Sequence, residues 1–149
     1  MSEQEEVSRD RGFAVSVIVI TPDGIPLVKE KELNRIPFFK FPGGKRDGRE
    51  TPVACAVREL QEETGLVLNP SDLVLLLEQN RRTHDYYLFG ARSPSLNGLK
   101  KVGDEGEYVG VFSLQDLLVR QGDIFPNHWT FEARKFIYGV PYPTEVCSS

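Results

Sequence analysis

Three glutamates, Glu59, Glu62 and Glu63, stand close together in the stretch PVACAVRELQEETG. If this stretch is a helix, each residue advances about 100° around the axis, and the three carboxylates fall on one stripe. Like charges at this spacing repel one another, and the helix dipole disfavours acids near the C-terminal end. Because Mg²⁺ and Mn²⁺ prefer carboxylate oxygens and offset that repulsion, the pattern predicts a divalent-metal site.

The loop before this stretch carries the opposite charge. Gly43 and Gly44 allow the backbone to approach a ligand closely, and Lys45, Arg46 and Arg49 follow within a few residues. Phosphate oxygens bind to metal ions and to cationic side chains together. The loop and the acidic stretch therefore predict a metal-dependent site for phosphate chemistry.

The segment from Gly44 to Leu66 resembles the Nudix box, Gly-x5-Glu-x7-Arg-Glu-U-x-Glu-Glu-x-Gly-U, where U is a bulky aliphatic residue. The matching residues are Gly44, Glu50, Arg58, Glu59, Leu60, Glu62, Glu63, Gly65 and Leu66. Each fixed residue type occupies only about 5–7% of positions in average proteins, so chance does not explain the match. The chain thus resembles the MutT-like Nudix hydrolases, which implies an α/β fold: a single-domain α/β/α sandwich with a mixed β-sheet.

The resemblance implies a metal-binding role for the acidic stripe. It assigns Glu59, Glu62 and Glu63 as ligands of a catalytic Mg²⁺ or Mn²⁺ ion, joined by the backbone carbonyl of Gly44. Carboxylate and carbonyl oxygens are the donors that these hard cations take.

The resemblance also assigns supporting roles. It pairs Arg58 with Glu50, so that the arginine orients the metal-binding face. In this family an acidic residue from a distant loop often completes the site as a ligand or general base. Glu105 is the candidate for that residue, and Glu107 and Asp104 are the alternatives.

The reaction implied is hydrolysis of a nucleoside diphosphate linked to another group, with water attacking a phosphorus atom of the pyrophosphate. Nucleoside triphosphates, nucleotide sugars and dinucleotides all belong to that substrate class. Two other classes of function stay open: a catalytically silent sensor that binds nucleotides, and a domain that binds protein partners.

Further residues could bind the substrate. Arg81 and Arg82 could hold a phosphate, although a solvated turn explains them equally well. Asn127 could hydrogen-bond to the edge of a base, or it could cap a helix instead. Lys45 and Arg46 of the glycine loop complete the predicted substrate-binding set.

Runs rich in β-branched and aromatic residues predict strands. The predicted strands are Phe13–Thr21, Ile25–Lys29, Phe38–Phe41, Leu73–Glu78, His84–Ala91 and Glu107–Phe112. The turn Pro22-Asp23-Gly24 predicts that the first two pair as a hairpin.

Capping residues predict the helices. Thr51 and Gly65 delimit a helix over Pro52–Thr64. A short helix is expected from Ser113 to Arg120, and a last helix from Asn127 or Thr130 to about Tyr138.

The composition is that of one ordinary globular domain. The chain has 149 residues and a net charge of −4, which argues against binding nucleic acid through general basic charge. Two cysteines and the lack of a long apolar run favour a cytoplasmic protein that does not enter a membrane. We expect a domain over residues 12–140, polar tails at 1–11 and 141–149, and a monomer or homodimer with a small nucleotide as partner.

Overall fold

A computed structural model describes residues 11–31 and 38–139 of the chain. The predicted tails therefore lie almost entirely outside the described residues. The strands are β1 (Phe13–Ile20), β2 (Ile25–Lys29), β3 (Gly43–Lys45), β4 (Val74–Asn80), β5 (Asp85–Arg92) and β6 (Tyr108–Phe112). The helices are α2 (Pro52–Thr64), α3 (Leu114–Val119) and α4 (Phe131–Tyr138), with short 3₁₀ turns η1 (Pro70–Asp72) and η2 (Gln121–Asp123).

A four-stranded mixed sheet forms the centre of the fold, in the order β3-β1-β5-β4. Strand β1 is antiparallel to β3 and parallel to β5, and β4 is antiparallel to β5. Strands β2 and β6 pair as a separate antiparallel ribbon. The prediction of a single α/β domain with a mixed sheet is confirmed.

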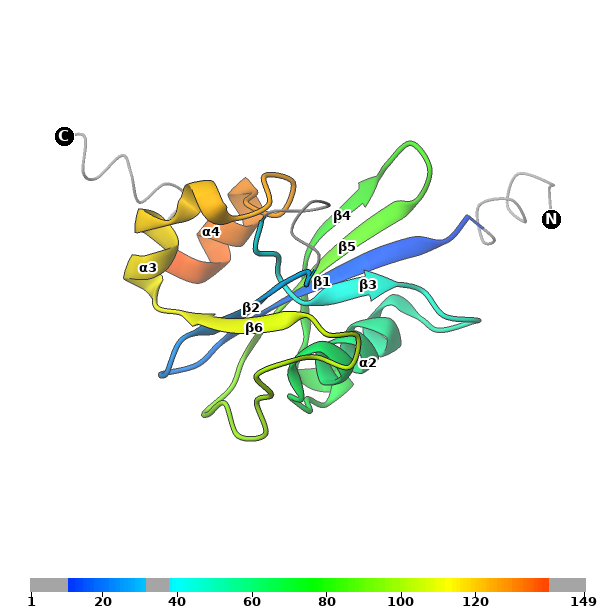
Figure 1. Cartoon of the computed structure of the whole chain (residues 1–149). Coiled ribbons are helices and arrows are strands. Elements are labelled where there is room, and N and C mark those ends of the chain that lie inside the picture. Colours follow the sequence, from blue (N-terminus) through cyan, green and yellow to red (C-terminus); the bar gives the residue numbers. More distant parts are fainter. Residues whose placement is uncertain (1–10, 32–37, 140–149) are drawn as a thin grey trace, which may run out of the picture.

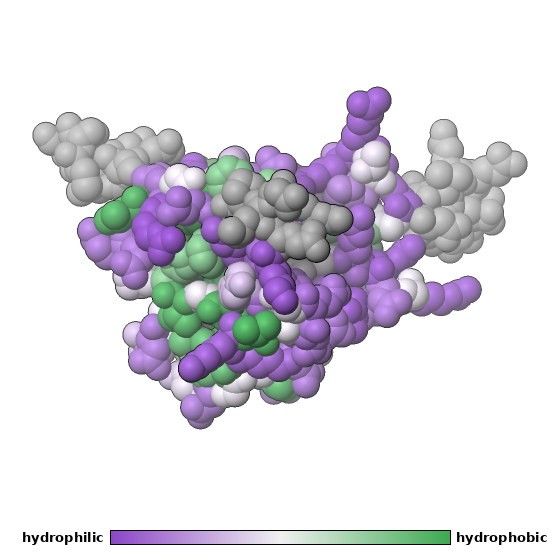
Figure 2. All heavy atoms as spheres, in the orientation of Figure 1, coloured by the Kyte–Doolittle hydropathy of each residue, from purple (hydrophilic) through white to green (hydrophobic). Residues whose placement is uncertain are grey.

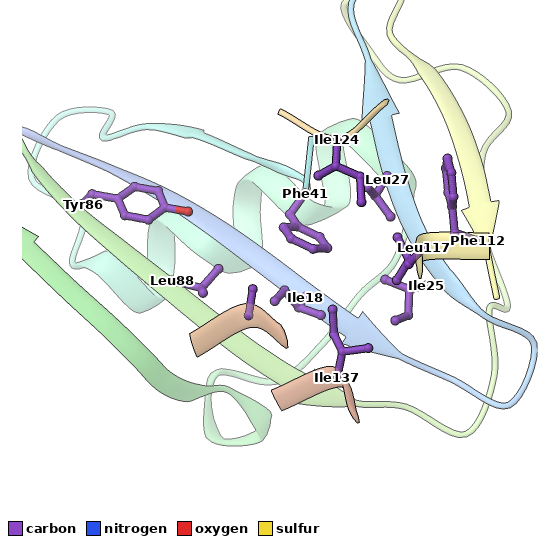
Figure 3. Packing of buried hydrophobic residues seen from close by; sticks show 11 residues of the cluster. Ile18, Ile25, Leu27, Phe41, Tyr86, Leu88, Phe112, Leu117, Ile124 and Ile137 are labelled. Carbon is purple, nitrogen blue, oxygen red and sulfur yellow. The ribbon is translucent and has the colours of Figure 1, made fainter. Parts of the chain in front are cut away.

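Helices cover both faces of this sheet because β1 is apolar on both faces. Side chains alternate along a strand, so Val15 and Val17 pack with the Leu60 side of α2. Ile18 points the other way and packs with Ile137 of α4. Figure 1 shows α2 on one side of the sheet and α3 and α4 on the other. Figure 3 shows from close by the buried cluster that contains Ile18 and Ile137.

The predicted hairpin of β1 and β2 is wrong beyond its turn. Thr21 and Gly24 form one bridge there, but β2 then pairs with β6 along its whole length. Burial accounts for this pairing, because Ile25 and Leu27 of β2 and Phe112 of β6 all pack into one buried apolar cluster.

The predicted strand Phe38–Phe41 is reduced to single bridges at Phe39 and Lys40. The strand that is antiparallel to β1 comes later, at Gly43–Lys45, where the sequence predicts a loop. A side chain at Gly43 would collide with the backbone carbonyl of Val15. Only glycine therefore allows β3 to come this close to β1.

Helix α2 has the predicted bounds, since its capping residues act as expected. The hydroxyl of Thr51 accepts a hydrogen bond from the Ala54 N–H at 3.2 Å. Gly65 ends the helix in the left-handed region, with a φ of 84°. Thr130, rather than Asn127, caps α4, and its hydroxyl accepts from the Ala133 N–H at 3.2 Å.

Polar residues cover most of the face drawn in Figure 2, and apolar atoms gather over the β2–β6 ribbon. Tyr108 and Val111 of β6 are exposed there. Within residues 11–31 and 38–139, no helix is long and apolar enough to cross a membrane.

Gly65 and Gly139 provide a matched test of the packing at the end of α2. Both end a helix with positive φ, but a Cβ at Gly139 would meet no atom of the described residues, whereas one at Gly65 would collide with the Gly98 carbonyl. We expect Gly139→Ala to lower the free energy of unfolding by about 1–2 kcal/mol, which is the left-handed penalty alone. Gly65→Ala should lower the free energy of unfolding by clearly more than Gly139→Ala does, as measured by denaturant unfolding. Equal losses in the two variants would show that the loop at Gly98 moves away without cost.

Candidate active site

The acidic side chains of α2 lie against the backbone of β3. A side chain at Gly44 would occupy the position of the Glu59 carboxylate. The N–H of Gly43 donates a hydrogen bond to Glu63 Oε1 at 2.8 Å. The two glycines thus bring a main-chain segment into direct contact with two carboxylates, and we call Glu59, Glu62 and Glu63 the acidic face.

The guanidinium of Arg58 links three glutamates. Its Nε and Nη2 donate to the two carboxylate oxygens of Glu50 at 2.7 and 2.9 Å. Its Nη1 donates to Glu59 Oε1 at 2.9 Å and to Glu62 Oε1 at 3.2 Å. These hydrogen bonds hold the pKa of Glu50 below its usual value. Arg58 is therefore paired with Glu50 in the structure, while its role in orienting bound metal stays a prediction.

Burial disfavours the ionised form of two carboxyl groups in the acidic face. Burial, with the nearby charges of Glu107 and Glu59, raises the pKa of Glu63 to about 8, although the hydrogen bond from the Gly43 N–H opposes this rise. Burial also raises the pKa of Glu59, with Glu62 and Glu105 contributing and Arg58 opposing. A cation beside these oxygens would stabilise their ionised forms.

The loop that holds Glu105 is fixed to the C-terminal end of α2. The Asp104 N–H donates to the Glu62 carbonyl at 3.0 Å, and the Lys100 N–H donates to the Thr64 carbonyl at 2.8 Å. These bonds satisfy helix carbonyls that have no partner within α2. As a result Glu105 acts on the pKa of Glu59 and Glu107 acts on that of Glu63.

The donor set of the acidic face fits a hard divalent cation. Carboxylates with a neighbouring main-chain carbonyl at Gly44 are typical ligands of Mg²⁺ and Mn²⁺. In the described part of the chain, no three acidic, histidine or cysteine side chains already converge on one point. Arg58 and the Gly43 N–H hold the carboxylates instead, and the second oxygen of Glu59 lies beside Gly44.

A cavity of about 190 Å³, the inner pocket, lies on the other side of Gly43 and Gly44 from the acidic face. Its polar lining residues are Ser16, Lys40, Lys45, Arg81, Tyr86 and His128. The pocket therefore presents mainly hydrogen-bond donors and positive charge.

His128 in the inner pocket is held as a neutral ring. Its Nδ1 accepts from the Phe41 N–H at 3.2 Å, which leaves the ring proton on Nε2, 3.4 Å from Ser16 Oγ. Burial, together with the charges of Lys40 and Arg81, lowers the pKa of His128 to about 3.

Tyr86 closes the same pocket. Figure 3 shows its ring at one end of the buried cluster, and the guanidinium of Arg81 lies 4.0 Å from the ring centre. Its hydroxyl is buried and has no partner within hydrogen-bond geometry among the described residues, although Ser16 is near enough to act on its pKa. A ligand with acceptor oxygens would satisfy this hydroxyl.

A second cavity of about 350 Å³, the outer pocket, adjoins the inner one through Lys45. Its other polar lining residues are Arg11, Arg46, Thr83 and His84. Arg11 Nε donates to Asp85 Oδ1 at 2.9 Å, and the Arg46 guanidinium lies 5.6 Å from the centre of the Phe13 ring.

A larger groove of about 510 Å³ lies between β4 and α4. It is lined mainly by apolar residues such as Leu75, Leu76 and Phe136 and shares no residue with the acidic face. Chemistry therefore favours the two basic pockets over the groove as the place for a phosphate-bearing ligand.

The structure distributes the predicted substrate-binding residues unevenly. Lys45 lines both basic pockets, Arg46 lines the outer one and Arg81 the inner one. Arg82 and Asn127 line neither of these two pockets.

Sequence reasoning missed three residues of the inner pocket: Ser16, Lys40 and His128. Ser16 carried a usable signal, because it is a polar residue within the apolar run of β1. Lys40 and His128 carried none, since only the fold brings them to β1.

A mixed sheet between two helical layers, with a glycine loop and an arginine-linked acidic face beside basic pockets, defines an α/β protein suited to phosphate compounds. The sequence profile of the NUDIX domain matches residues 10–135. The chain belongs to the Nudix family.

Solved structures share this fold at low sequence identity. The MutT structure from the study of Aliivibrio salmonicida and Vibrio cholerae is 21% identical, with a TM-score of 0.69 over 87% of this chain and 98% of that one. A Nudix hydrolase from Nitrosomonas europaea is 20% identical, with a TM-score of 0.63 over 91% and 94% of the two chains.

A bifunctional NMN adenylyltransferase/ADP ribose pyrophosphatase from Francisella tularensis, complexed with AMP and a manganese ion, is 22% identical. The TM-score is 0.64, over 79% of this chain and 38% of that one. No curated protein matches the chain at a significant level. At these identities the structures establish the fold alone.

The buried neutral ring of His128 predicts a loss of stability in acid. Between its folded pKa of about 3 and the ordinary value of 6.5, the unfolded chain binds the proton and the folded chain does not. Stability is therefore complete above that window and falls as the pH drops through it.

We expect His128→Gln to flatten the decline in unfolding free energy between neutral pH and about pH 4, measured by denaturant titration. The same substitution at His84, the only other histidine, is the control and should leave the decline in place. Parallel curves for wild type and His128→Gln would contradict the neutral buried ring.

Proposed function

We propose that the protein is a Mg²⁺- or Mn²⁺-dependent pyrophosphohydrolase that cleaves a nucleoside diphosphate linked to another group. The observation that supports this most is the burial of Glu59 and Glu63 against the two glycines, with a raised pKa at both carboxyl groups. A structural role offers no reason to bury like charges in this way, whereas a divalent cation offsets them.

Each group of the site has a part in this proposal. Glu59, Glu62, Glu63 and the Gly44 carbonyl would hold the metal, which when bound lowers the pKa of water and neutralises charge on phosphate oxygens. Arg58 would hold Glu50 and keep the helix surface in register with β3. Glu105 would take a proton from the attacking water or join the ligands.

A catalytically silent sensor or a protein-binding domain is the weaker interpretation. Every glutamate of the box is present, and a sensor needs neither the full acidic face nor an acidic loop beside it. Cytoplasmic localisation and a monomeric or homodimeric state stay predictions.

The first test is Glu62→Gln, assayed for phosphate or nucleoside monophosphate release from a panel of nucleotides. Loss of one metal ligand should lower kcat at least about 100-fold, and a chelator should abolish wild-type release. Since the Glu62 side chain is 44% exposed, the free energy of unfolding should change by less than about 1 kcal/mol.

Glu78→Gln on β4 is the matched control, because it removes an exposed carboxylate far along the chain from the acidic face. It should keep wild-type turnover. Near-normal activity of Glu62→Gln would overturn the assignment of this residue as a metal ligand.

A second test distinguishes Glu105 from Glu107 as the residue that acts on the attacking water. If Glu105 acts on the attacking water, Glu105→Gln should lower kcat by roughly 10²- to 10⁴-fold with little change in KM. Its pH–rate profile should also lose the acidic limb, because a general base acts only when it is deprotonated. A normal rate with Glu105→Gln and a slow Glu107→Gln would transfer the role to Glu107, which acts on Glu63.

A further inference from the structure

Positive charge gathers around the inner and outer pockets, which adjoin β1 and β3. The cationic residues that line the inner and outer pockets are Arg11, Lys40, Lys45, Arg46 and Arg81. Within the described part of the chain, no carboxylate lines either pocket. Of the acids in the described part of the chain, Asp85 bonds to Arg11 at 2.9 Å and Glu30 lies 3.5 Å from Lys40.

This concentration is not a consequence of composition, because the chain as a whole carries a net charge of −4. Cationic side chains around one cavity repel one another, and an anion that enters the cavity offsets the repulsion. The placement of charge therefore favours an anionic ligand in the pockets.

The two pockets differ in the residues that line them. Gly43 and Gly44, which contact the acidic face, line the inner pocket but not the outer one. Lys45 lines both pockets, so a ligand that reaches from the acidic face into the inner pocket can extend into the outer one. A group in the outer pocket is a remote part of the same ligand.

The donors of the outer pocket suit a phosphate. Two arginines, Arg11 and Arg46, line this pocket together with Lys45 and Thr83. Guanidinium groups bind phosphate through paired N–H donors, whereas lysine acts as a point charge. The volume of about 350 Å³ also leaves room for the sugar or chain that bears the phosphate.

We propose that the outer pocket binds a phosphate group that the substrate carries in addition to the pyrophosphate cleaved at the acidic face. The inference rests on the proposed function and narrows its substrates to nucleotides with a remote phosphate. Arg46 is the residue that selects them.

The decisive measurement is binding without catalysis. Wild-type protein in buffer with a chelator is titrated with inorganic tripolyphosphate by calorimetry. Arg46→Gln should weaken binding roughly tenfold, since it removes a charge-assisted contact. Arg46→Lys should recover part of that loss, because charge returns without the paired donors.

Lys135→Gln is the charge-matched control, since Lys135 is exposed on α4 and lines neither basic pocket. Its affinity for tripolyphosphate should stay within about twofold of wild type. An equal loss in Lys135→Gln and Arg46→Gln, or no loss in Arg46→Gln, would overturn the outer-pocket site.

A second arm uses turnover of ADP-ribose and its 2′-phosphate, with Mg²⁺ present. Wild type should show a higher kcat/KM for the phosphorylated compound, and Arg46→Gln should remove the difference. An active wild type without that preference overturns the remote-phosphate site. If no nucleotide is cleaved at all, the proposed function fails, while the tripolyphosphate titration still decides whether the pocket binds phosphate.

Discussion

The arrangement of the site depends on the burial of several carboxylates around one guanidinium. Arg58 binds both oxygens of Glu50 and reaches Glu59 and Glu62, whereas the N–H of Gly43 holds Glu63. A buried carboxylate without enough positive charge destabilises the fold unless it takes a proton or a cation. Arg58 and the Gly43 N–H stabilise the carboxylates in part, and a metal ion bound between the carboxylates would supply further positive charge.

The glycines of β3 make this closeness possible and also separate two regions of opposite charge. Without side chains at Gly43 and Gly44, acidic side chains contact one side of the strand and a cavity lined by cations adjoins the other. An anionic ligand with a metal ion can thus meet both regions across a single layer of backbone.

Features within one continuous segment could be predicted from the sequence, and features that join distant segments could not. The bounds of α2 follow from Thr51 and Gly65, and the acidic face follows from spacing on that helix. The partner of β2 is β6, a strand far away in the sequence, which packs with it into one buried cluster. Ser16 and His128 meet only because α4 and its preceding turn pack across β1, which no local pattern encodes.

The proposed chemistry and the proposed selectivity consequently lie on different segments. Metal binding belongs to α2 and the loop fixed to its end, whereas the basic pockets draw on β1, β5 and the turns beside them. A substitution such as Arg46→Gln removes a charge from an outer pocket without changing any hydrogen bond of Arg58. The same acidic face can therefore serve different nucleotides when only these flanking segments change.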